Sequence, residues 1–233
     1  MSIMQPLERA DSSRYCDQLR EFIDSTSPIS DSSWEKMCEI MNFWRVGKGV
    51  RLLDYMEVES SVRFLGKGIV KCEDHFNDKS FVYDFRMAPI ILSETVSLLN
   101  NTRSRITLET VTECEFIELP RKPFVEMLFS NLDLSKFCAV GVVNYLGMTH
   151  YRQALLRTTD AQQRYKHFLR EFPGVVLDVK LEDIASYIGV TQQSLSRIRK
   201  NVIWCENEKE LETLSNELEV VHGKSLKSPA TYI

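Results

Sequence analysis

The stretch LEDIASYIGVTQQSLSRIRKN, residues 181–201, decides how the C-terminal part of this chain folds. Its first eight residues have apolar side chains at helical spacing, and Gly189 stands where such a helix would end. Thr191 is a good N-cap for a second helix over residues 192–200. Ala185 is small enough for the two helices to cross closely, so the stretch predicts a helix-turn-helix.

The second helix would turn Leu195 and Ile198 towards the first and leave a polar side free. Amide and guanidinium side chains on that side pair well with adenine and guanine in the major groove of DNA. Arg199, Lys200 and the hydroxyl of Thr191 would hold phosphates. A solvated helical hairpin without a ligand is the alternative interpretation. The candidate DNA-binding residues are Thr191, Gln192, Gln193, Ser196, Arg197, Arg199 and Lys200.

The distribution of charge favours an anionic partner for this part of the chain. The 233 residues carry a net charge of −4, with 43% apolar and 27% charged residues. Residues 151–204 hold nine Lys and Arg against five Asp and Glu, a net of +4, so the rest carries −8. The basic block coincides with the predicted helix pair, which is consistent with a nucleic acid as its partner.

The cysteines and the N-terminus indicate the compartment. Six cysteines are spread along the chain without a C-x-x-C pair, which argues against a zinc site or a disulfide framework. The start, MSIMQPLERADSSRY, has no apolar leader, and no run approaches about 18 apolar residues. We therefore expect a cytoplasmic protein with free thiols and no membrane partner.

Motifs for catalysis are missing from the sequence. The chain contains no G-x-S-x-G, Walker loop, H-E-x-x-H or dinucleotide-binding glycine motif. We therefore expect no catalytic residues, no metal site and no enzymatic activity.

Before the helix pair, the pattern changes from helical to extended and back. Short amphipathic helices are expected at residues 14–23 and 32–41. From Phe43, β-type runs recur about every ten residues, as in an antiparallel barrel or sandwich, with HFND (residues 75–78) as a hairpin turn. The clearest β-type runs are residues 49–58, 61–72, 80–87, 105–112 and 114–120.

A helical pattern without proline then runs from residue 134 to about 156. Gly141 and Gly147 within it permit close approach of another backbone. The sequence allows two interpretations of this helix, which are a dimer interface along it and packing of the helix on its own domain.

The connection to the helix pair and the C-terminal tail follow. Thr159 or Asp160 should cap a helix that reaches Phe172, and residues 175–181 are expected to form an extended link. The segment from Cys205 is acidic, with a helix expected near residues 208–221.

These features together resemble one known family. VKLEDIASYIGVTQQSLSRIRKN (residues 179–201) is similar to the helix-turn-helix of CRP/FNR transcription regulators, in the form common in Bacteroidetes-type members. SVRFLGKGIVK (residues 61–71) resembles a strand–glycine–strand unit of that family's cyclic-nucleotide-binding β-roll. Residues 93–128 resemble the cassette and strands that follow.

The resemblance implies an α+β fold in three parts. These are an antiparallel, jelly-roll-type β-roll sensor with N-terminal helices (residues 1–131), a central dimerisation helix (132–157) and a helix-turn-helix domain with an acidic tail (158–233). It also implies a homodimeric transcription regulator that binds double-stranded DNA, responds to a small-molecule effector and works with RNA polymerase. The alternative is a ligand- or protein-sensing module whose helix pair contacts protein rather than DNA.

The same resemblance suggests where an effector would bind. In cAMP-binding members a short helix opens with Gly-Glu and ends near Arg-Ser, so Glu94 would hold the ribose, and Arg103 with Ser104 the phosphate. Ser93 replaces the glycine, and the long helix lacks the Thr-Ser pair that reaches the base. We therefore do not favour a cyclic nucleotide over another small ligand or a pocket that has lost its ligand.

The oxygen-sensing branch of the family binds an iron–sulfur cluster through N-terminal cysteines. Cys16 is the only cysteine before Cys38 in this chain. We therefore expect no iron–sulfur cluster.

Overall fold

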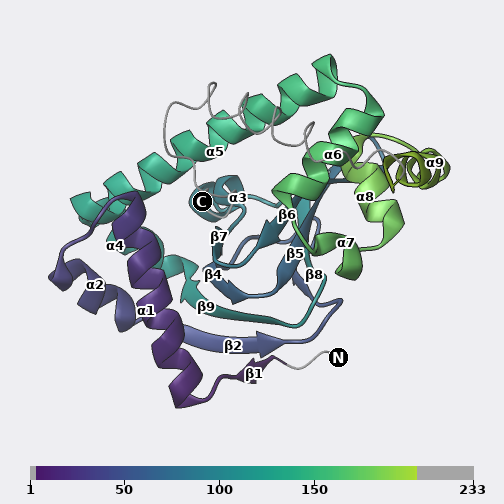
Figure 1. Ribbon diagram of the computed structural model, residues 1–233. Helices are drawn as coiled ribbons and strands as arrows, with labels where there is room; N and C mark the ends of the chain where they lie inside the picture. Colours follow the sequence, from purple (N-terminus) through teal and green to yellow (C-terminus); the bar gives the residue numbers. More distant parts are fainter. Residues whose placement is uncertain (1–3, 204–233) are drawn as a thin grey trace. The chain divides into compact units, whose positions relative to one another are not determined.

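The computed structural model describes residues 4–203 (Figure 1). Contacts between residues divide the chain into two compact units, and the division falls between His150 and Tyr151, inside helix α5 (Leu132–Thr158). The predicted acidic tail and the helix expected near residues 208–221 lie outside the described residues. Within residues 4–203, no helix is both long and apolar enough to cross a membrane.

The first unit is built on two antiparallel sheets, in the strand orders β1-β2-β9-β4-β7 and β3-β8-β5-β6. Each β-type run predicted from the sequence overlaps at least one of these strands, so the predicted antiparallel roll is confirmed. The strands are β1 (Gln5–Pro6), β2 (Asn42–Val46), β3 (Arg51–Leu53), β4 (Ser61–Lys67), β5 (Ile69–Phe76), β6 (Lys79–Met87), β7 (Ile90–Leu92), β8 (Ile106–Thr110) and β9 (Cys114–Pro120).

The hairpin turn predicted at HFND is confirmed between β5 and β6. Asn77 and Asp78 have φ angles of 49° and 59°, the left-handed conformation that both central residues of a tight hairpin turn require. Asn and Asp tolerate this conformation better than most residues, which explains why the turn forms here. Phe76 pairs with Lys79 directly across it.

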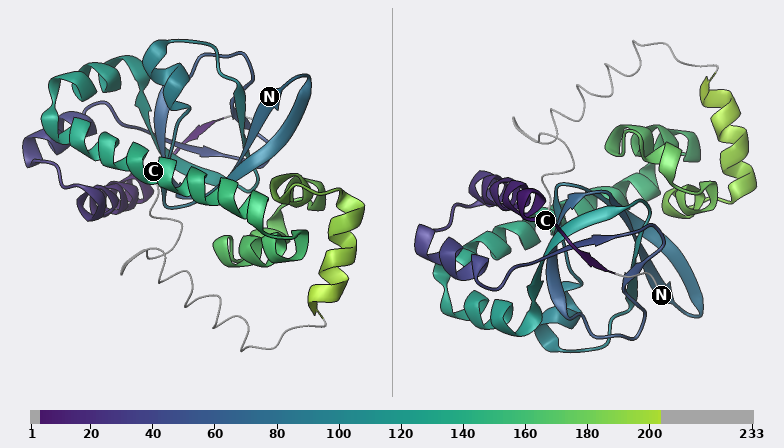
Figure 2. Two further views of the ribbon diagram at one scale, coloured as in Figure 1. Left: turned by 90° about the horizontal axis from the view of Figure 1, so that it is seen from above. Right: turned by 90° about the horizontal axis from the view of Figure 1, so that it is seen from below.

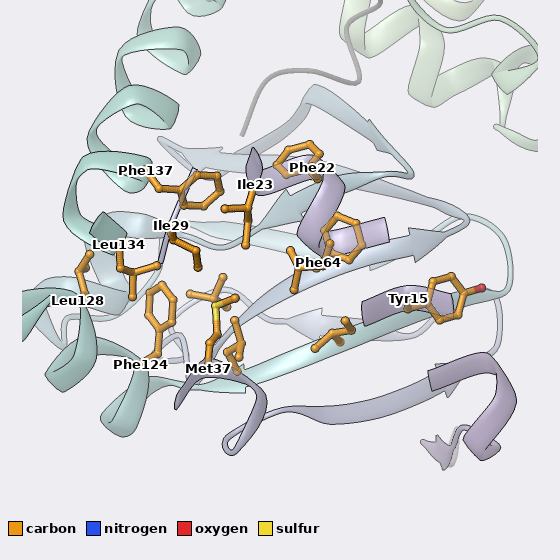
Figure 3. Packing of buried hydrophobic residues seen from close by; sticks show 14 of the residues in the cluster. Tyr15, Phe22, Ile23, Ile29, Met37, Phe64, Phe124, Leu128, Leu134 and Phe137 are labelled. Carbon is orange, nitrogen blue, oxygen red and sulfur yellow. The ribbon is translucent and has the colours of Figure 1, made fainter. Parts of the chain in front are cut away.

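Helices cover one face of the larger sheet, where α1 (Arg9–Thr26) and α4 (Arg121–Ser130) pack on β4 and β9. The helices predicted at residues 14–23 and 32–41 are confirmed, but α1 is longer and α2 (Asp31–Cys38) is shorter. Figure 3 shows buried residues of this layer, and those it labels come from α1, α2 and α4, from the loop between α1 and α2, from β4 and from the start of α5. They include Phe22, Ile23, Met37, Phe64, Phe124, Leu134 and Phe137.

A separate apolar cluster lies between the two sheets and includes Leu65, Val70, Leu108 and Phe116. Residues alternate along β9, because Phe116 faces this cluster while Ile117 faces the helices.

The second unit contains α6 (Ala161–Glu171), α8 (Leu181–Ile188) and α9 (Gln192–Ile203). Asp160 caps α6 in a reciprocal capping box with Gln163, as one of the two predicted cap residues. The extended link predicted for residues 175–181 is wrong, since Val175–Asp178 form the short helix α7. Gly174, at φ 84°, turns the chain there and lets the fully buried Val175 reach the core of the unit.

A polar cluster ties α1 to the larger sheet. The ring of Tyr15 lies so close to Gly66 that a Cβ atom at that position would overlap it. The Tyr15 hydroxyl donates to Glu115 Oε2 (2.8 Å), and Arg45 Nε (2.9 Å) and Lys67 Nζ (3.3 Å) donate to Oε1. Burial alone would raise the pKa of Glu115, but these three donors lower it below its ordinary value.

We expect Glu115→Gln to lower the free energy of unfolding by about 2 kcal/mol at neutral pH, because it removes the charge that Arg45 and Lys67 bind. The pKa of Glu115 is lower in the folded than in the unfolded protein. The carboxylate therefore stabilises the fold above its ordinary pKa, and this contribution disappears as the pH falls through the folded-state value.

Denaturant unfolding at neutral and at acidic pH would measure this difference. Glu113→Gln is the matched control, because Glu113 is exposed and pairs only with Lys67 in the described contacts. The control should change stability by less than about 0.5 kcal/mol. A Glu115→Gln effect of equal size at both pH values would contradict the assignment.

Candidate functional site

The turn between α8 and α9 forms at Gly189, which takes the left-handed conformation (φ 72°, ψ 42°). Its N–H donates to the carbonyl oxygen of Ser186 (3.1 Å), and Val190 N–H donates to that of Ala185 (2.9 Å). These two bonds satisfy carbonyl groups at the end of α8 that would otherwise lack a partner. The interruption of the helical sequence at Gly-Val-Thr is therefore a C-terminal cap followed by a tight turn.

The second helix starts at the predicted residue. Thr191 Oγ1 accepts a hydrogen bond from the N–H of Ser194 (3.2 Å), the usual contact of an N-cap. The carbonyl oxygen of Thr191 accepts from Leu195 N–H (3.0 Å), so α9 begins directly after it.

The two helices pack on α6 through their apolar sides. Ile184, Ala185 and Ile188 of α8 and Leu195 of α9 are all buried, and α6 contacts both helices. Aromatic rings contact one another between α6 and α8, and they belong to Tyr165, Phe168, Phe172 and Tyr187.

Polar contacts fix α6 to the same pair. Arg164 Nε donates to the carbonyl oxygen of Ile188 (2.8 Å), at the end of α8. Glu171 Oε2 accepts from the Tyr187 hydroxyl (2.9 Å), and Glu171 Oε1 accepts from Arg152 (2.9 Å). The second unit is therefore held by apolar packing and by charged groups that bridge its helices.

The structure brings the predicted DNA-binding residues to one helix and exposes most of them. Both views in Figure 2 show α9 at one edge of the second unit, where it contacts α6 and α8. Arg199 differs from the others, because it is half-buried and hydrogen-bonds to Tyr165, where it opposes the rise in pKa that burial gives this tyrosine. The exposed residues are Thr191, Gln192, Gln193, Ser196, Arg197 and Lys200.

The predicted effector residues lie around helix α3 (Thr95–Asn100), and the side chains of Glu94 and Ser104 bind backbone groups of the chain. Glu94 caps α3, since its carboxylate accepts from the N–H groups of Val96 (3.2 Å) and Ser97 (2.6 Å). Ser104 is buried, and its hydroxyl exchanges hydrogen bonds with the backbone of Ile106. The side chain of Arg103 is exposed.

Arg105 and Glu109, two charged residues that follow Ser104 in the sequence, pair with residues of the smaller sheet. Arg105 pairs with Asp74 (3.2 Å), and Glu109 faces Arg51 and Lys71.

A buried carboxylate beside α3 was missed from the sequence. Glu59 is fully buried, and its Oε1 accepts from Ser60 N–H (3.0 Å), Ser61 N–H (3.3 Å) and Arg63 Nη1 (3.0 Å). Its Oε2 accepts from the N–H of Glu94 (3.2 Å). The backbone donors at the start of α3 are therefore bound by carboxylates of the chain itself. A glutamate two residues before the strand at residues 61–67 was the available signal.

No protein-family model matches this chain, and no curated protein sequence matches it. Solved structures match its fold. A CRP/FNR-family transcriptional regulator from Eubacterium rectale superposes with a TM-score of 0.63 at 9% identity, over 74% of this chain and 83% of that one. FixK2 from Bradyrhizobium japonicum gives 0.61 at 17% identity, over 70% and 84% of the two chains.

A cyclic nucleotide-binding domain from Methylobacillus flagellatus gives a TM-score of 0.53 at 13% identity, over 67% of this chain and 87% of that domain. At these identities the similarity concerns the fold. The chain therefore shares the fold of cyclic nucleotide-binding domains and CRP/FNR-family regulators, which confirms that part of the predicted resemblance.

We expect Leu195→Ala to destabilise the second unit by about 2–5 kcal/mol, because Leu195 is completely buried and its removal leaves a cavity under α9. Gln193→Ala, two residues away on the exposed side, should change stability by less than about 0.5 kcal/mol. Denaturant unfolding followed by circular dichroism measures both. Equal effects of the two substitutions would contradict the assignment of the buried side.

Proposed function

We propose that this chain is a sequence-specific transcription regulator of the CRP/FNR type, whose α8–α9 helix-turn-helix places α9 in the major groove of double-stranded DNA. The observation that carries the proposal is the exposed polar side of α9, opposite the buried Leu195. Gln193 and Arg197 on that side have the hydrogen-bonding groups that read adenine and guanine. Thr191 and Lys200, at the two ends of the exposed side, would bind phosphates.

The composition of this surface favours DNA over a protein partner. Between residues 181 and 200, no large apolar side chain is exposed, whereas the centre of a protein interface is usually apolar and aromatic. Arg197 and Lys200 add positive charge to the exposed side of α9. The half-buried Arg199 would contribute to binding mainly by holding α9 on Tyr165.

We further propose that the chain forms a homodimer through α5. One face of this helix is buried by Leu134, Phe137 and Gly141, while Val143 and Leu146 on another face are 66% and 51% exposed. An exposed row of apolar and small residues on a long helix is typical of a helix–helix interface. The row consists of Ala139, Val140, Val143, Leu146 and Gly147.

A dimer would present two α9 helices to one duplex. Regulators of this geometry contact half-sites about one helical turn, roughly 34 Å, apart. A cytoplasmic location and a contact with RNA polymerase belong to the same proposal, since a transcription regulator acts where the polymerase does.

Selection of the full-length protein against random duplex DNA tests the proposal. The expected result is enrichment of one motif, with an affinity that falls steeply as salt rises because bound phosphates release counterions. No enrichment of any motif would contradict DNA binding and would favour the alternative, a sensing module whose helix pair contacts protein.

We expect Arg197→Ala to weaken binding to the selected site by about 1–3 kcal/mol and to relax the preference at one base pair. Lys200→Ala should weaken binding to all sequences more evenly and reduce the slope of log affinity against log salt by about 1. Lys122→Ala removes the same charge from an exposed position on α4 and should leave DNA affinity unchanged. If Arg197→Ala left the selected motif unaltered, Arg197 would not be a base-reading residue.

We expect Val143→Glu to weaken the dimer at least about 100-fold, because it buries an unpaired charge in the proposed interface. Analytical ultracentrifugation over a range of concentrations measures the dissociation constant. Lys122→Glu, with a larger change of charge on α4, should leave the dimer intact. A Val143→Glu protein that dimerises like the wild type would place the interface elsewhere.

A further inference from the structure

An ion pair faces the inside of the β-roll, where apolar residues are expected. Asp84 and Arg86 lie opposite Cys72 and Val70 in the β5–β6 ladder, so these four side chains share one side of the sheet. Cys72 and Val70 belong to the apolar cluster between the sheets. Asp84 Oδ2 lies 2.8 Å from Arg86 Nε, and both residues are buried.

Helix α5 supplies another partner of Arg86. The guanidinium carbon lies 4.9 Å from the centre of the Tyr145 ring, in cation–π geometry. Tyr145 follows Gly141 by one helical turn, so it continues the buried face of α5. The contact therefore joins the middle of α5 to strand β6 within the first unit.

The surroundings of Arg86 keep it charged. Burial is the largest single influence and lowers the pKa of Arg86. The attraction of Asp84, Cys72, Tyr145 and Tyr83 together outweighs burial, so the pKa of Arg86 is raised. The Cys72 thiol lies within hydrogen-bonding reach of Arg86, and burial raises the pKa of this thiol to about 12. A buried charge of this kind is stabilising only while its partners stay in place. Movement of Tyr145 away from Arg86 would therefore destabilise the first unit.

Polar groups around α3 are likewise bound by residues of the chain itself. The carboxylates of Glu94 and Glu59 bind the N–H groups of Val96, Ser97 and Glu94, which are the donors that an anionic ligand would need at α3. At the far end of α3, Arg121 Nε donates to the carbonyl oxygen of Leu98 (2.6 Å). Residues of the chain therefore supply both the negative charge at α3 and the contact to α5.

We propose that Arg86 and Tyr145 form a permanent contact that holds α5 on the β-roll without a bound nucleotide. This inference rests on the proposed function, because it describes how the sensor of such a regulator stays assembled. The pair acts as a positioning device, since the Arg86 guanidinium lies directly over the Tyr145 ring. A cyclic nucleotide would have to displace Glu94 and Glu59 from the α3 amides before its phosphate could bind.

Hydrogen exchange of the full-length protein, measured by mass spectrometry, tests the contact. Exchange in peptides covering residues 138–150 should be equal with and without millimolar cAMP or cGMP. Tyr145→Ala should accelerate it about tenfold, because local opening no longer breaks the contact with Arg86. Tyr145→Phe is the matched control, which retains the ring and should stay within about threefold of the wild type.

Two results would overturn the proposal. The first is stronger protection of residues 138–150 in the wild-type protein on addition of either nucleotide. The second is a Tyr145→Ala protein that exchanges like the wild type. DNA titration of the same samples is independent of both. If the wild-type protein did not bind DNA while hydrogen exchange gave the expected results, the proposed function would be contradicted and the Arg86–Tyr145 contact would be established.

Discussion

The burial of Leu195 in the packing of α9 on α8 and α6 is the interaction on which the proposed DNA-binding surface depends. Leu195 is completely buried, and a helix that buries one side must expose the side opposite. Gly189 allows this packing, because its left-handed conformation reverses the chain within three residues and brings α9 back across the small Ala185. The orientation of Gln193 and Arg197 is thus a consequence of apolar packing rather than of a bound partner.

The β-roll follows another constraint, which is that charges inside a protein must find partners. The charged residues buried in it include Glu59, Arg63, Asp84 and Arg86. Each has a partner from the chain: Glu59 binds Arg63 and three backbone N–H groups, and Asp84 binds Arg86. The chain has the fold of nucleotide-binding domains, and residues of the chain itself bind these buried charges, so the fold alone does not identify a ligand.

The sequence predicted the features that depend on local chemistry. Gly189, Thr191 and the hairpin turn at Asn77 and Asp78 each have a particular backbone conformation, and these residue types favour that conformation. Residues 175–181 were predicted wrongly, because their branched apolar residues suggest a strand while burial of Val175 after the Gly174 turn favours a helix.

Contacts between distant segments were beyond prediction from the sequence. Tyr145 and Arg86 are far apart along the chain, and only the folded structure brings the ring of one over the guanidinium of the other. The same holds for Glu59 and the N–H of Glu94.

Hydroxyl-radical footprinting on a selected duplex tests the central claim most directly. Two protected patches on one face of the duplex, about one helical turn apart, are the result that paired α9 helices predict. One patch, or uniform protection, would contradict it.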